Sequence, residues 1–304
     1  MPRYNSSVDG TSLFYRSYGP ESKPLPFDRK DQSEAARGLT LVFLHQWGLS
    51  SRLFDPLLLS LCETHGFRVI APDRRGHGKS DWNGTAPGNG ITYSELGDDV
   101  AGLLKHLQVG PFVLIGSSMG TGEALSAYSN STYIQENCRG MIWISTCLPY
   151  PVASPGNPKA LPRGAWDSTL LSLREDRYSF VANTFRGPLG IGTTGSLSDK
   201  QMAFYEGIFF EADPIAVERC LQVFTTEDLT EDVKKFGHTS DTPLLLIHGE
   251  NDGGVPVESS VQPLQELIPR AQVKVYEGGG HILFISYADR LRDDILSFVG
   301  GLKL

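Results

Sequence analysis

The sequence predicts an α/β fold in which a mainly parallel sheet is flanked by helices, and three observations support this prediction. Short apolar runs recur along the 304 residues of the chain. They are apolar throughout rather than alternating, as expected for strands that helices cover on both faces. Most are separated by segments long enough to hold a helix, and this repeated order is typical of parallel sheets. The length suits one large core around a single sheet.

The apolar runs define the expected strands in chain order. The first, at residues 13–15, comes soon after Asp9 and Gly10 and is expected to lead the sheet as an antiparallel strand. The others comprise residues 39–44, 67–71, 112–115, 141–144, 244–247 and 273–276. The segments between them supply the helices. Residues 94–107 carry apolar side chains at helical spacing behind a Ser94 cap, and two further helices are expected at residues 258–267 and 287–299.

The alternation of expected strands and helices stops after Leu148 and resumes at Leu244. This interval opens with a stretch rich in proline and glycine, followed by helical candidates that bear aromatic residues. About 80 residues with so many breakers would not bury a core of their own. We therefore expect a core formed by residues 1–148 and 231–304, with residues 149–230 inserted as a helical lid.

Composition and charge argue against several classes of protein. The chain has 27 Lys and Arg against 35 Asp and Glu, a net charge of −8, which disfavours a nucleic-acid partner. No apolar window approaches the length of about 18 residues that spans a membrane, and the N-terminus lacks a signal-peptide pattern, so a cytoplasmic protein is expected. The four cysteines lie far apart without metal-ligand spacing, which predicts reduced thiols and no metal site. The oligomeric state stays open.

The strongest motif is the G-x-S-x-G sequence from Gly116 to Gly120. It follows the apolar run at 112–115 directly, and the next residues can begin a helix. In this context the motif is typical of a nucleophile elbow. Its glycines are needed because side chains there would collide with the neighbouring strand or helix. We predict that Ser118 is a catalytic nucleophile at a helix N-terminus, where backbone N–H groups face developing negative charge.

A serine nucleophile needs a base and an orienting acid, and both follow in chain order. Asp252 lies in a tight loop after the run at 244–247, and His281 ends a glycine loop after the run at 273–276. Ligands bind at the carboxyl ends of the strands in such sheets, so both side chains should lie near Ser118. The sequence therefore predicts a Ser118, His281 and Asp252 triad.

Two neighbouring residues are weaker candidates. Glu250 could replace Asp252 as the acid, but it lies next to the end of its strand. His248 ends the same strand and is expected to pack or to hydrogen-bond locally. No acid follows the run at 141–144, so the alternative acid position after that strand is vacant.

The remaining requirement is a pair of N–H groups that bind the oxyanion. Trp47, after the first strong core strand, can supply one, and Met119 can supply the other. Taken together, these motifs resemble the α/β-hydrolase superfamily and, within it, the haloperoxidase-like esterases. The resemblance runs from the H-x-W-G sequence at His45, through the loop at 72–80 and the elbow, to the acid and histidine loops.

The resemblance implies an eight-stranded, mainly parallel sheet with a helical lid. It also implies that the loop at 72–80 is structural, with Arg74 and Arg75 bridging loops rather than binding phosphate. One departure concerns Gln46, because relatives usually have glycine at this position. In one interpretation its side chain faces the site, where it narrows the acyl site or offers an amide to the substrate. In the other it points to solvent and only its backbone matters. Both interpretations stay open.

The insertion would lie over Ser118 and is rich in aromatic residues. Most of them are expected to pack within the lid, while some line an apolar pocket. We predict that Trp166, Phe185 and Phe209 contribute to this pocket together with Gln46. Such a pocket favours a small apolar or aromatic substrate over a sugar or a peptide.

These residues predict a serine hydrolase that cleaves a small to medium apolar carboxylic ester, thioester or lactone through an acyl-enzyme, with no metal or organic cofactor. Three alternatives stay open. The same triad could hydrolyse C–C bonds or release or cyclise a polyketide-like substrate. His281 could support cofactor-free oxygenase chemistry, or the site could act as a perhydrolase. The third alternative is a non-enzymatic ligand receptor on the same fold. Haloalkane dehalogenases and epoxide hydrolases need a carboxylate where Ser118 stands, which disfavours both.

Overall fold

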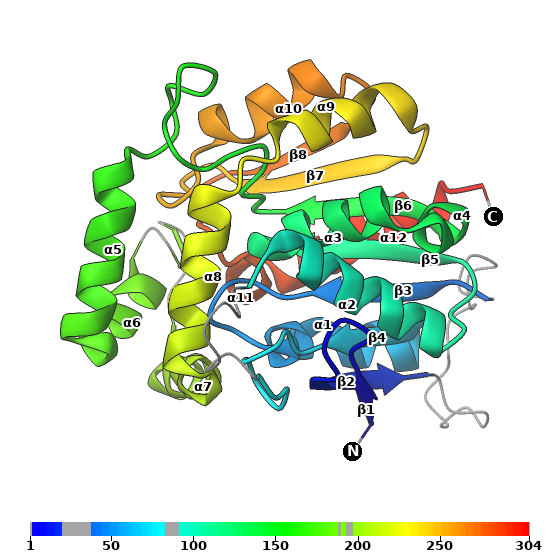
Figure 1. Cartoon of the computed structure of the whole chain (residues 1–304), viewed down its shortest axis with the longest axis horizontal. Helices are drawn as coiled ribbons and strands as arrows, with labels where there is room; N and C mark the ends of the chain where they lie inside the picture. Colours follow the sequence, from blue (N-terminus) through cyan, green and yellow to red (C-terminus); the bar gives the residue numbers. More distant parts are fainter. Residues whose placement is uncertain (1, 20–37, 83–90, 188–189, 193–196, 304) are drawn as a thin grey trace.

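An eight-stranded sheet lies at the centre of the molecule, with helices on both faces and a further group of helices beyond one end (Figure 1). The computed structural model describes residues 2–19, 38–82, 91–187, 190–192 and 197–303. In spatial order the strands are β1 (Arg3–Asn5), β2 (Ser12–Tyr18), β4 (Arg68–Pro72), β3 (Thr40–Leu44), β5 (Phe112–Ser117), β6 (Cys138–Ile144), β7 (Leu244–Gly249) and β8 (Gln272–Tyr276). β2 is antiparallel to β1 and to β4, and all other neighbours are parallel. The predicted fold class is confirmed.

Helices connect most of the parallel strands. In chain order the α-helices are α1 (Asp55–Leu59), α2 (Tyr93–His106), α3 (Met119–Asn130), α4 (Thr132–Asn137), α5 (Arg163–Glu175), α6 (Arg177–Arg186), α7 (Asp199–Glu211), α8 (Pro214–Thr226), α9 (Thr230–Thr239), α10 (Val261–Leu267), α11 (Leu283–Ser286) and α12 (Ala288–Gly300). Single turns of 3-10 or π type occur at η2 (Ser51–Phe54), η3 (Ser60–Thr64) and η4 (Val257–Ser259).

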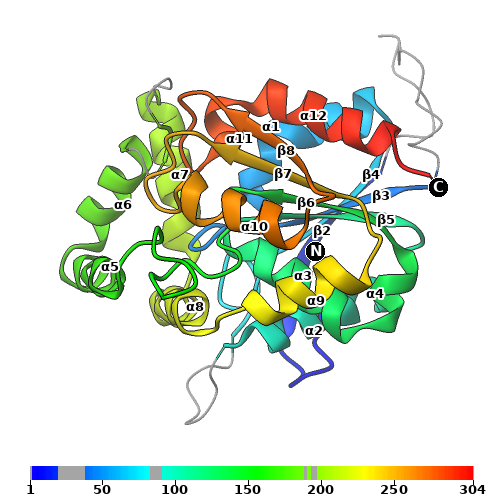
Figure 2. The same ribbon diagram turned by 90° about the horizontal axis from the view of Figure 1, so that it is seen from above.

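Alternate residues of each central strand face opposite helical layers. On β5, Val113 and Ile115 pack in the cluster that includes α1 and α12, whereas Phe112 and Leu114 pack in the cluster that includes α2, α3, α9 and α10. Figure 2 shows these two layers on opposite sides of the sheet. Because both faces are covered, apolar residues follow one another without alternation in the central strands, as in Phe112–Ile115 of β5, which explains the continuous runs in the sequence.

The N-terminal strand β1 was not predicted. Its three residues contain no apolar run, and it forms through antiparallel pairing with β2, with only Tyr4 buried. A three-residue strand of this kind depends on its partner rather than on its own sequence pattern.

Two helix predictions need correction, one at the start of the helix and one in its interior. The cap of α2 is Thr92 rather than Ser94, because Thr92 has an extended backbone and its Oγ1 accepts the N–H of Glu95 at 3.1 Å. Ser94 therefore lies inside the helix. The helix expected at 258–267 is divided, because Ser260 leaves helical geometry (φ −125°, ψ −67°) between η4 and α10.

A helical insertion, α5 to α9, joins β6 to β7. Helices α5 to α8 lie together beyond one end of the sheet, at the left in Figure 1. Helix α9 packs against the sheet itself, where the ring of Phe236 lies 5.7 Å from that of Trp143. The division of the chain at residues 149 and 230 stays a prediction.

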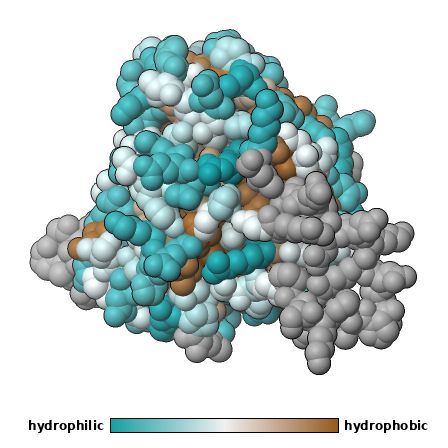
Figure 3. All heavy atoms as spheres, turned by 90° about the vertical axis from the view of Figure 1, so that its right-hand side faces the viewer, coloured by the Kyte–Doolittle hydropathy of each residue, from teal (hydrophilic) through white to brown (hydrophobic). Residues whose placement is uncertain are grey.

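The opposite end of the molecule, seen in Figure 3, is mainly hydrophilic, with small hydrophobic areas between the polar side chains. Within the described ranges, no helix combines the length and the apolar character needed to cross a membrane.

Candidate active site

Ser118 lies in the sharp turn between β5 and α3, with a positive φ of 53°. The turn depends on the two glycines beside it. A Cβ atom on Gly116 would lie 2.5 Å from the carbonyl oxygen of Gly120, and one on Gly120 would lie 2.4 Å from that of Leu44. Only glycine fits at these positions without moving the backbone. The turn therefore holds the Ser118 side chain at the N-terminus of α3.

Ser118, His281 and Asp252 form one hydrogen-bonded chain. His281 Nε2 lies 2.8 Å from Ser118 Oγ, and His281 Nδ1 lies 2.6 Å from Asp252 Oδ2. An ionised carboxylate only accepts, so Nδ1 carries the hydrogen and Nε2 is left to accept the hydrogen of Ser118. The structure thus brings together three residues that are separated by 134 and 29 positions in the sequence (252 − 118 and 281 − 252).

Asp252 is held by its own loop. Its Oδ1 accepts the backbone N–H groups of Gly254 at 3.0 Å and Val255 at 2.9 Å. Burial opposes ionisation of this carboxylate, but the neighbouring His281 and His248 overcome that effect and lower the pKa of Asp252 below its ordinary value. Asp252 is therefore an oriented, ionised partner for the imidazole of His281.

The two weaker candidates have other contacts. Glu250 accepts the backbone N–H of Gly278 at 2.9 Å and so supports the glycine loop before His281. His248 is fully buried, and its Nε2 lies 2.7 Å from the carbonyl oxygen of Val255 and 3.2 Å from Asp252. The structure places Asp252, not Glu250, against His281.

The backbone N–H groups of Trp47 and Met119 lie at matching positions just beyond the ends of two neighbouring strands. β3 and β5 are parallel with Leu44 opposite Gly116, and each of these N–H groups comes three residues after that pair. Met119 is the first residue of α3, where N–H groups have no partner within the helix. Among the described residues, neither group has a protein acceptor. Both can therefore donate to an oxyanion formed at Ser118.

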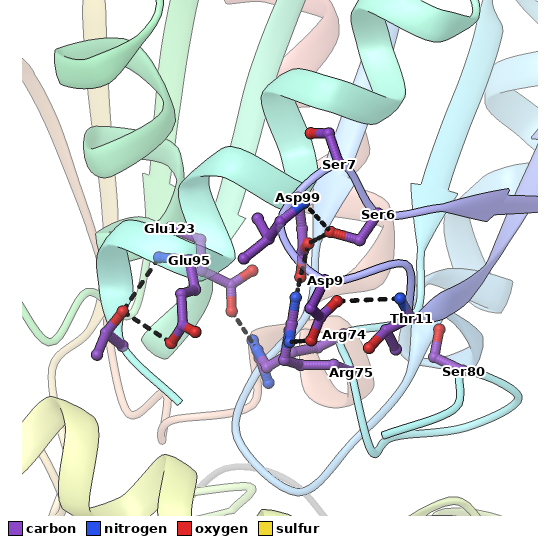
Figure 4. Close-up of polar contacts among 12 residues, drawn as sticks. Ser6, Ser7, Asp9, Thr11, Arg74, Arg75, Ser80, Glu95, Asp99 and Glu123 are labelled. Atoms are coloured by element: carbon purple, nitrogen blue, oxygen red, sulfur yellow. Dashed lines mark hydrogen bonds and ion pairs between the residues drawn. The ribbon is translucent and has the colours of Figure 1, made fainter. Parts of the chain in front are cut away.

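Arg74 connects the loop of Trp47 to helix α3, which begins beside Ser118. Its guanidinium donates to the carbonyl oxygens of His45 at 2.6 Å and Gln46 at 3.3 Å, and it pairs with Glu123 of α3 in a buried ion pair. Figure 4 shows Arg74 and Glu123 pointing toward each other from the two elements. Burial and the charge of Arg74 lower the pKa of His45, so this imidazole is neutral and accepts the N–H of Arg74.

Arg75 makes a second set of ion pairs in the same loop. It binds Asp99 through two hydrogen bonds, of 2.8 and 2.9 Å, and it binds Asp9 at 2.8 Å (Figure 4). Both arginines are buried and engaged by carboxylates. This agrees with a structural loop at 72–80 and leaves neither guanidinium available to a phosphate.

A family model described as alpha/beta hydrolase fold matches residues 40–287. The chain belongs to the α/β-hydrolase family. This confirms the resemblance that the sequence motifs carry.

Relatives of this α/β-hydrolase include haloperoxidases and esterases. A non-heme chloroperoxidase of Streptomyces lividans is 31% identical over 298 residues, which cover 97% of this chain and 98% of the relative. A bifunctional esterase/perhydrolase of Acinetobacter calcoaceticus is 30% identical over 300 residues, covering 97% and 99%. The bromoperoxidase structure from Bacillus anthracis has a TM-score of 0.81 at 25% identity, covering 98% of this chain and 99% of that one. An esterase from Exiguobacterium antarcticum shares the fold with a TM-score of 0.83 at 21% identity, covering 98% of each chain.

The α/β-hydrolase has a cavity of about 350 Å³ in front of Ser118 and His281. All four residues predicted for the pocket line it, namely Gln46, Trp166, Phe185 and Phe209. The prediction did not include Phe180, Phe224 and Cys147, which also line it. Phe180 and Phe224 lie on α6 and α8, and their helical spacing did not show which face meets the site. The wall is mainly aromatic and aliphatic.

Cys147 is the neighbour of Ser118 that the sequence interpretation treated only as a buried thiol. Its Sγ lies 3.3 Å from Ser118 Oγ. Burial raises the pKa of this thiol to about 12, although the hydrogen bond with Ser118 acts in the opposite direction. The protonated thiol can donate to Ser118 Oγ while the hydroxyl hydrogen points to His281.

Gln46 does not point to solvent. Its side chain is buried, and its Nε2 donates to Ser117 Oγ at 3.0 Å and to the carbonyl oxygen of His281 at 3.1 Å. Of the two interpretations left open by the sequence, the structure supports the one in which this side chain faces the site. It also links the loop of Trp47 to the glycine loop that carries His281.

Residues 190–192, between α6 and α7, contact the glycine loop that carries His281. Gly192 forms a β-bridge with Gly279, and the N–H of Ile282 donates to the carbonyl oxygen of Gly190 at 2.8 Å. A Cβ atom on Gly192 would lie 2.4 Å from the Gly278 carbonyl oxygen, so the close approach requires glycine. The insertion is thereby attached directly beside His281.

Proposed function

We propose that this α/β-hydrolase is a serine hydrolase that cleaves a small to medium apolar carboxylic ester, thioester or lactone. The observation that carries the proposal is the hydrogen-bonded chain of Ser118, His281 and Asp252 at the wall of a largely apolar cavity. Nucleophile, base and orienting acid are all within hydrogen-bonding distance of their partners, which is the arrangement that acyl transfer needs.

The proposed reaction proceeds through an acyl-enzyme. Ser118 Oγ attacks the carbonyl carbon while its proton passes to His281 Nε2, and Asp252 stabilises the imidazolium that forms. The N–H groups of Trp47 and Met119 donate to the oxyanion. His281 then gives the proton to the leaving alcohol or thiol. Water, deprotonated by His281, attacks the acyl-enzyme and releases the acid and the free serine.

The cavity supports an apolar substrate of limited size. Its volume of about 350 Å³ is at the small end of the range of roughly 300–1,000 Å³ for small-molecule sites. Five aromatic residues of the insertion line it, namely Trp166, Phe180, Phe185, Phe209 and Phe224. Apart from His281, no titratable side chain other than the thiol of Cys147 contributes to the described lining. A strongly charged substrate would lose its hydration without gaining a partner.

Perhydrolysis is the second candidate, and the names of the relatives favour it. The relatives described above include a chloroperoxidase and a bifunctional esterase/perhydrolase. In this reaction hydrogen peroxide replaces water: its oxygen forms a bond to the acyl carbon, the bond to Ser118 Oγ breaks, and the serine recovers a proton. The product is a peroxy acid instead of the acid. Both reactions share the same acyl-enzyme.

The decisive experiment combines active-site labelling with turnover. A fluorophosphonate probe should label Ser118 in the wild-type protein, and Ser118→Ala should lose labelling and lower hydrolysis of p-nitrophenyl butyrate by at least about 10³-fold. Ser117→Ala, which changes the adjacent serine, should still be labelled. Adding hydrogen peroxide and measuring peroxy acid separates the two candidates. Unchanged turnover in Ser118→Ala would refute both.

A further inference from the structure

The amide of Gln46 has a fixed orientation in the cavity wall. The side chain is 3% exposed, and Nε2 faces the carbonyl oxygen of His281. A carbonyl oxygen only accepts, so the amide atom turned toward it must be the nitrogen. The second hydrogen of Nε2 goes to Ser117 Oγ. Both donor positions of Gln46 are therefore occupied by the protein.

The amide oxygen of Gln46 has no such partner. Among the described residues, no donor lies within hydrogen-bonding distance of Oε1. Since Nε2 and Oε1 are on opposite sides of the same planar group, Oε1 points away from Ser117 and His281. Gln46 lines the cavity, and Oε1 is not among the fully enclosed polar atoms of the described residues, so this oxygen is an unpaired acceptor that stays accessible beside the reaction centre. A hydrogen-bond donor on a ligand, or a water molecule, can satisfy it there.

We propose that Gln46 Oε1 accepts a hydrogen bond from a hydroxyl group on the acyl part of the substrate, at the first or second carbon beyond the reacting carbonyl. The inference rests on the proposed serine hydrolase and names its substrate class: esters, thioesters or lactones of otherwise apolar hydroxy acids. Gln46 is then a specificity-determining residue.

The position of Gln46 sets the position of the hydroxyl. Gln46 precedes Trp47, whose N–H is the proposed oxyanion donor, and it is bonded to Ser117, the residue before the nucleophile. A donor that reaches Oε1 while the carbonyl is at Ser118 must therefore be close to that carbonyl along the acyl chain.

The chemistry of the wall favours a hydroxyl over an ammonium group. Asp252 is the carboxylate next to the site, and it is already bonded to His281, Gly254 and Val255. The wall is otherwise neutral and mainly apolar. A neutral amide oxygen can satisfy one hydroxyl, but it cannot compensate a buried positive charge.

The test compares ethyl esters of matched acids. Ethyl 2-hydroxybutanoate, 2-methoxybutanoate and 2-methylbutanoate differ only in whether the second carbon carries a donor, a blocked donor or a methyl group, and the 3-substituted series repeats the comparison. In at least one series, the wild-type protein should hydrolyse the hydroxy ester with a kcat/KM about tenfold above that of the methoxy and methyl esters.

Substitution of Gln46 assigns the preference to its amide. Gln46→Met keeps the length of the side chain and removes the acceptor, so the ratio of hydroxy to methyl ester should fall to about one. The ratio cancels any general loss of activity from the broken bond to His281. Thr169→Val is the matched control, because Thr169 lines another part of the cavity and its hydroxyl already bonds the Ala165 carbonyl oxygen. Its ratio should stay at the wild-type value.

Failure of this inference is distinguishable from failure of the proposed function. If Ser118 is labelled and esters are hydrolysed, but the wild-type ratio of kcat/KM for hydroxy and methyl esters is near one in both series, only the role of Gln46 is overturned. The same holds if Gln46→Met keeps the wild-type preference for the hydroxy ester. Absence of labelling and of ester turnover would overturn the hydrolase and this inference together. If Gln46→Met does not fold, the wild-type comparison of hydroxy with methoxy ester decides.

Discussion

The imidazole of His281 is anchored to Asp252 through a hydrogen bond of 2.6 Å between Nδ1 and Oδ2, in a loop that holds the other carboxylate oxygen with two backbone N–H groups. The carboxylate therefore fixes both the position of the ring and the nitrogen that carries the hydrogen. The opposite nitrogen is left free to accept from Ser118, which is the state that a general base requires.

Asp252→Asn should lower kcat by about 10³–10⁴-fold with little change in folding. An amide at this position can donate to Nδ1, which places the hydrogen on Nε2 and leaves the histidine unable to accept from Ser118. The measurement is steady-state hydrolysis of p-nitrophenyl butyrate. Glu250→Gln is the matched control. It also converts a carboxylate to an amide in the same loop, but at a residue that does not contact His281. A larger loss in Glu250→Gln than in Asp252→Asn would contradict the assignment.

Arg74→Met should destabilise the protein by about 3–5 kcal/mol, because it leaves the carboxylate of Glu123 buried without a partner. Chemical denaturation gives the free energy of unfolding. The double variant Arg74→Met, Glu123→Met removes both charges, so much of the loss should be recovered. Equal stability of the single and double variants would show that the ion pair is not the cause.

Gly120→Ala should destabilise the protein by about 3 kcal/mol and reduce activity, because the new Cβ would lie 2.4 Å from the carbonyl oxygen of Leu44. Gly207→Ala provides the opposite case. Gly207 is exposed in α7, and a Cβ there meets nothing within 4 Å, so this variant should gain about 0.5–1 kcal/mol. Thermal or urea unfolding measures both. A stable, active Gly120→Ala variant would refute the steric account of the elbow.

Cys147 should resist thiol reagents over the ordinary pH range. Burial raises its pKa to about 12, so at pH 8 only about one thiol in 10⁴ is ionised, and the reactive thiolate accumulates only as the pH approaches 12. Incubation with iodoacetamide between pH 7 and 9 should therefore leave the rate of p-nitrophenyl butyrate hydrolysis unchanged. Unfolding in urea before labelling exposes all four cysteines and serves as the control. Fast inactivation that Cys147→Ser abolishes would contradict this prediction.

Much of the site could be predicted because its determinants are local. The elbow at Ser118 depends on adjacent glycines and on the strand before them, and Asp252 and His281 each follow an apolar run that forms a strand. The parallel sheet then carries all three to one edge, as the topology requires. The choice of Asp252 over Glu250 used the same information, and the hydrogen bonds of the acid loop agree with it.

The orientation of Gln46 depends on contacts that no sequence window contains. Its amide binds Ser117 and the carbonyl oxygen of His281, which lie 71 and 235 positions away. Phe224 illustrates the same limit, because the apolar spacing of α8 does not show which residues meet the cavity and which meet other helices. β1 was not predicted for a different reason: its three residues contain no apolar run, and the strand forms through pairing with β2.

The junction between Gly192 and Gly279, with the hydrogen bond from the Ile282 N–H to the Gly190 carbonyl oxygen, attaches the insertion to the backbone that carries His281. These contacts flank His281 on both sides. The backbone that carries the imidazole is therefore positioned in part by residues 190–192, so the geometry of the base depends on two regions of the chain that are about 90 positions apart in the sequence.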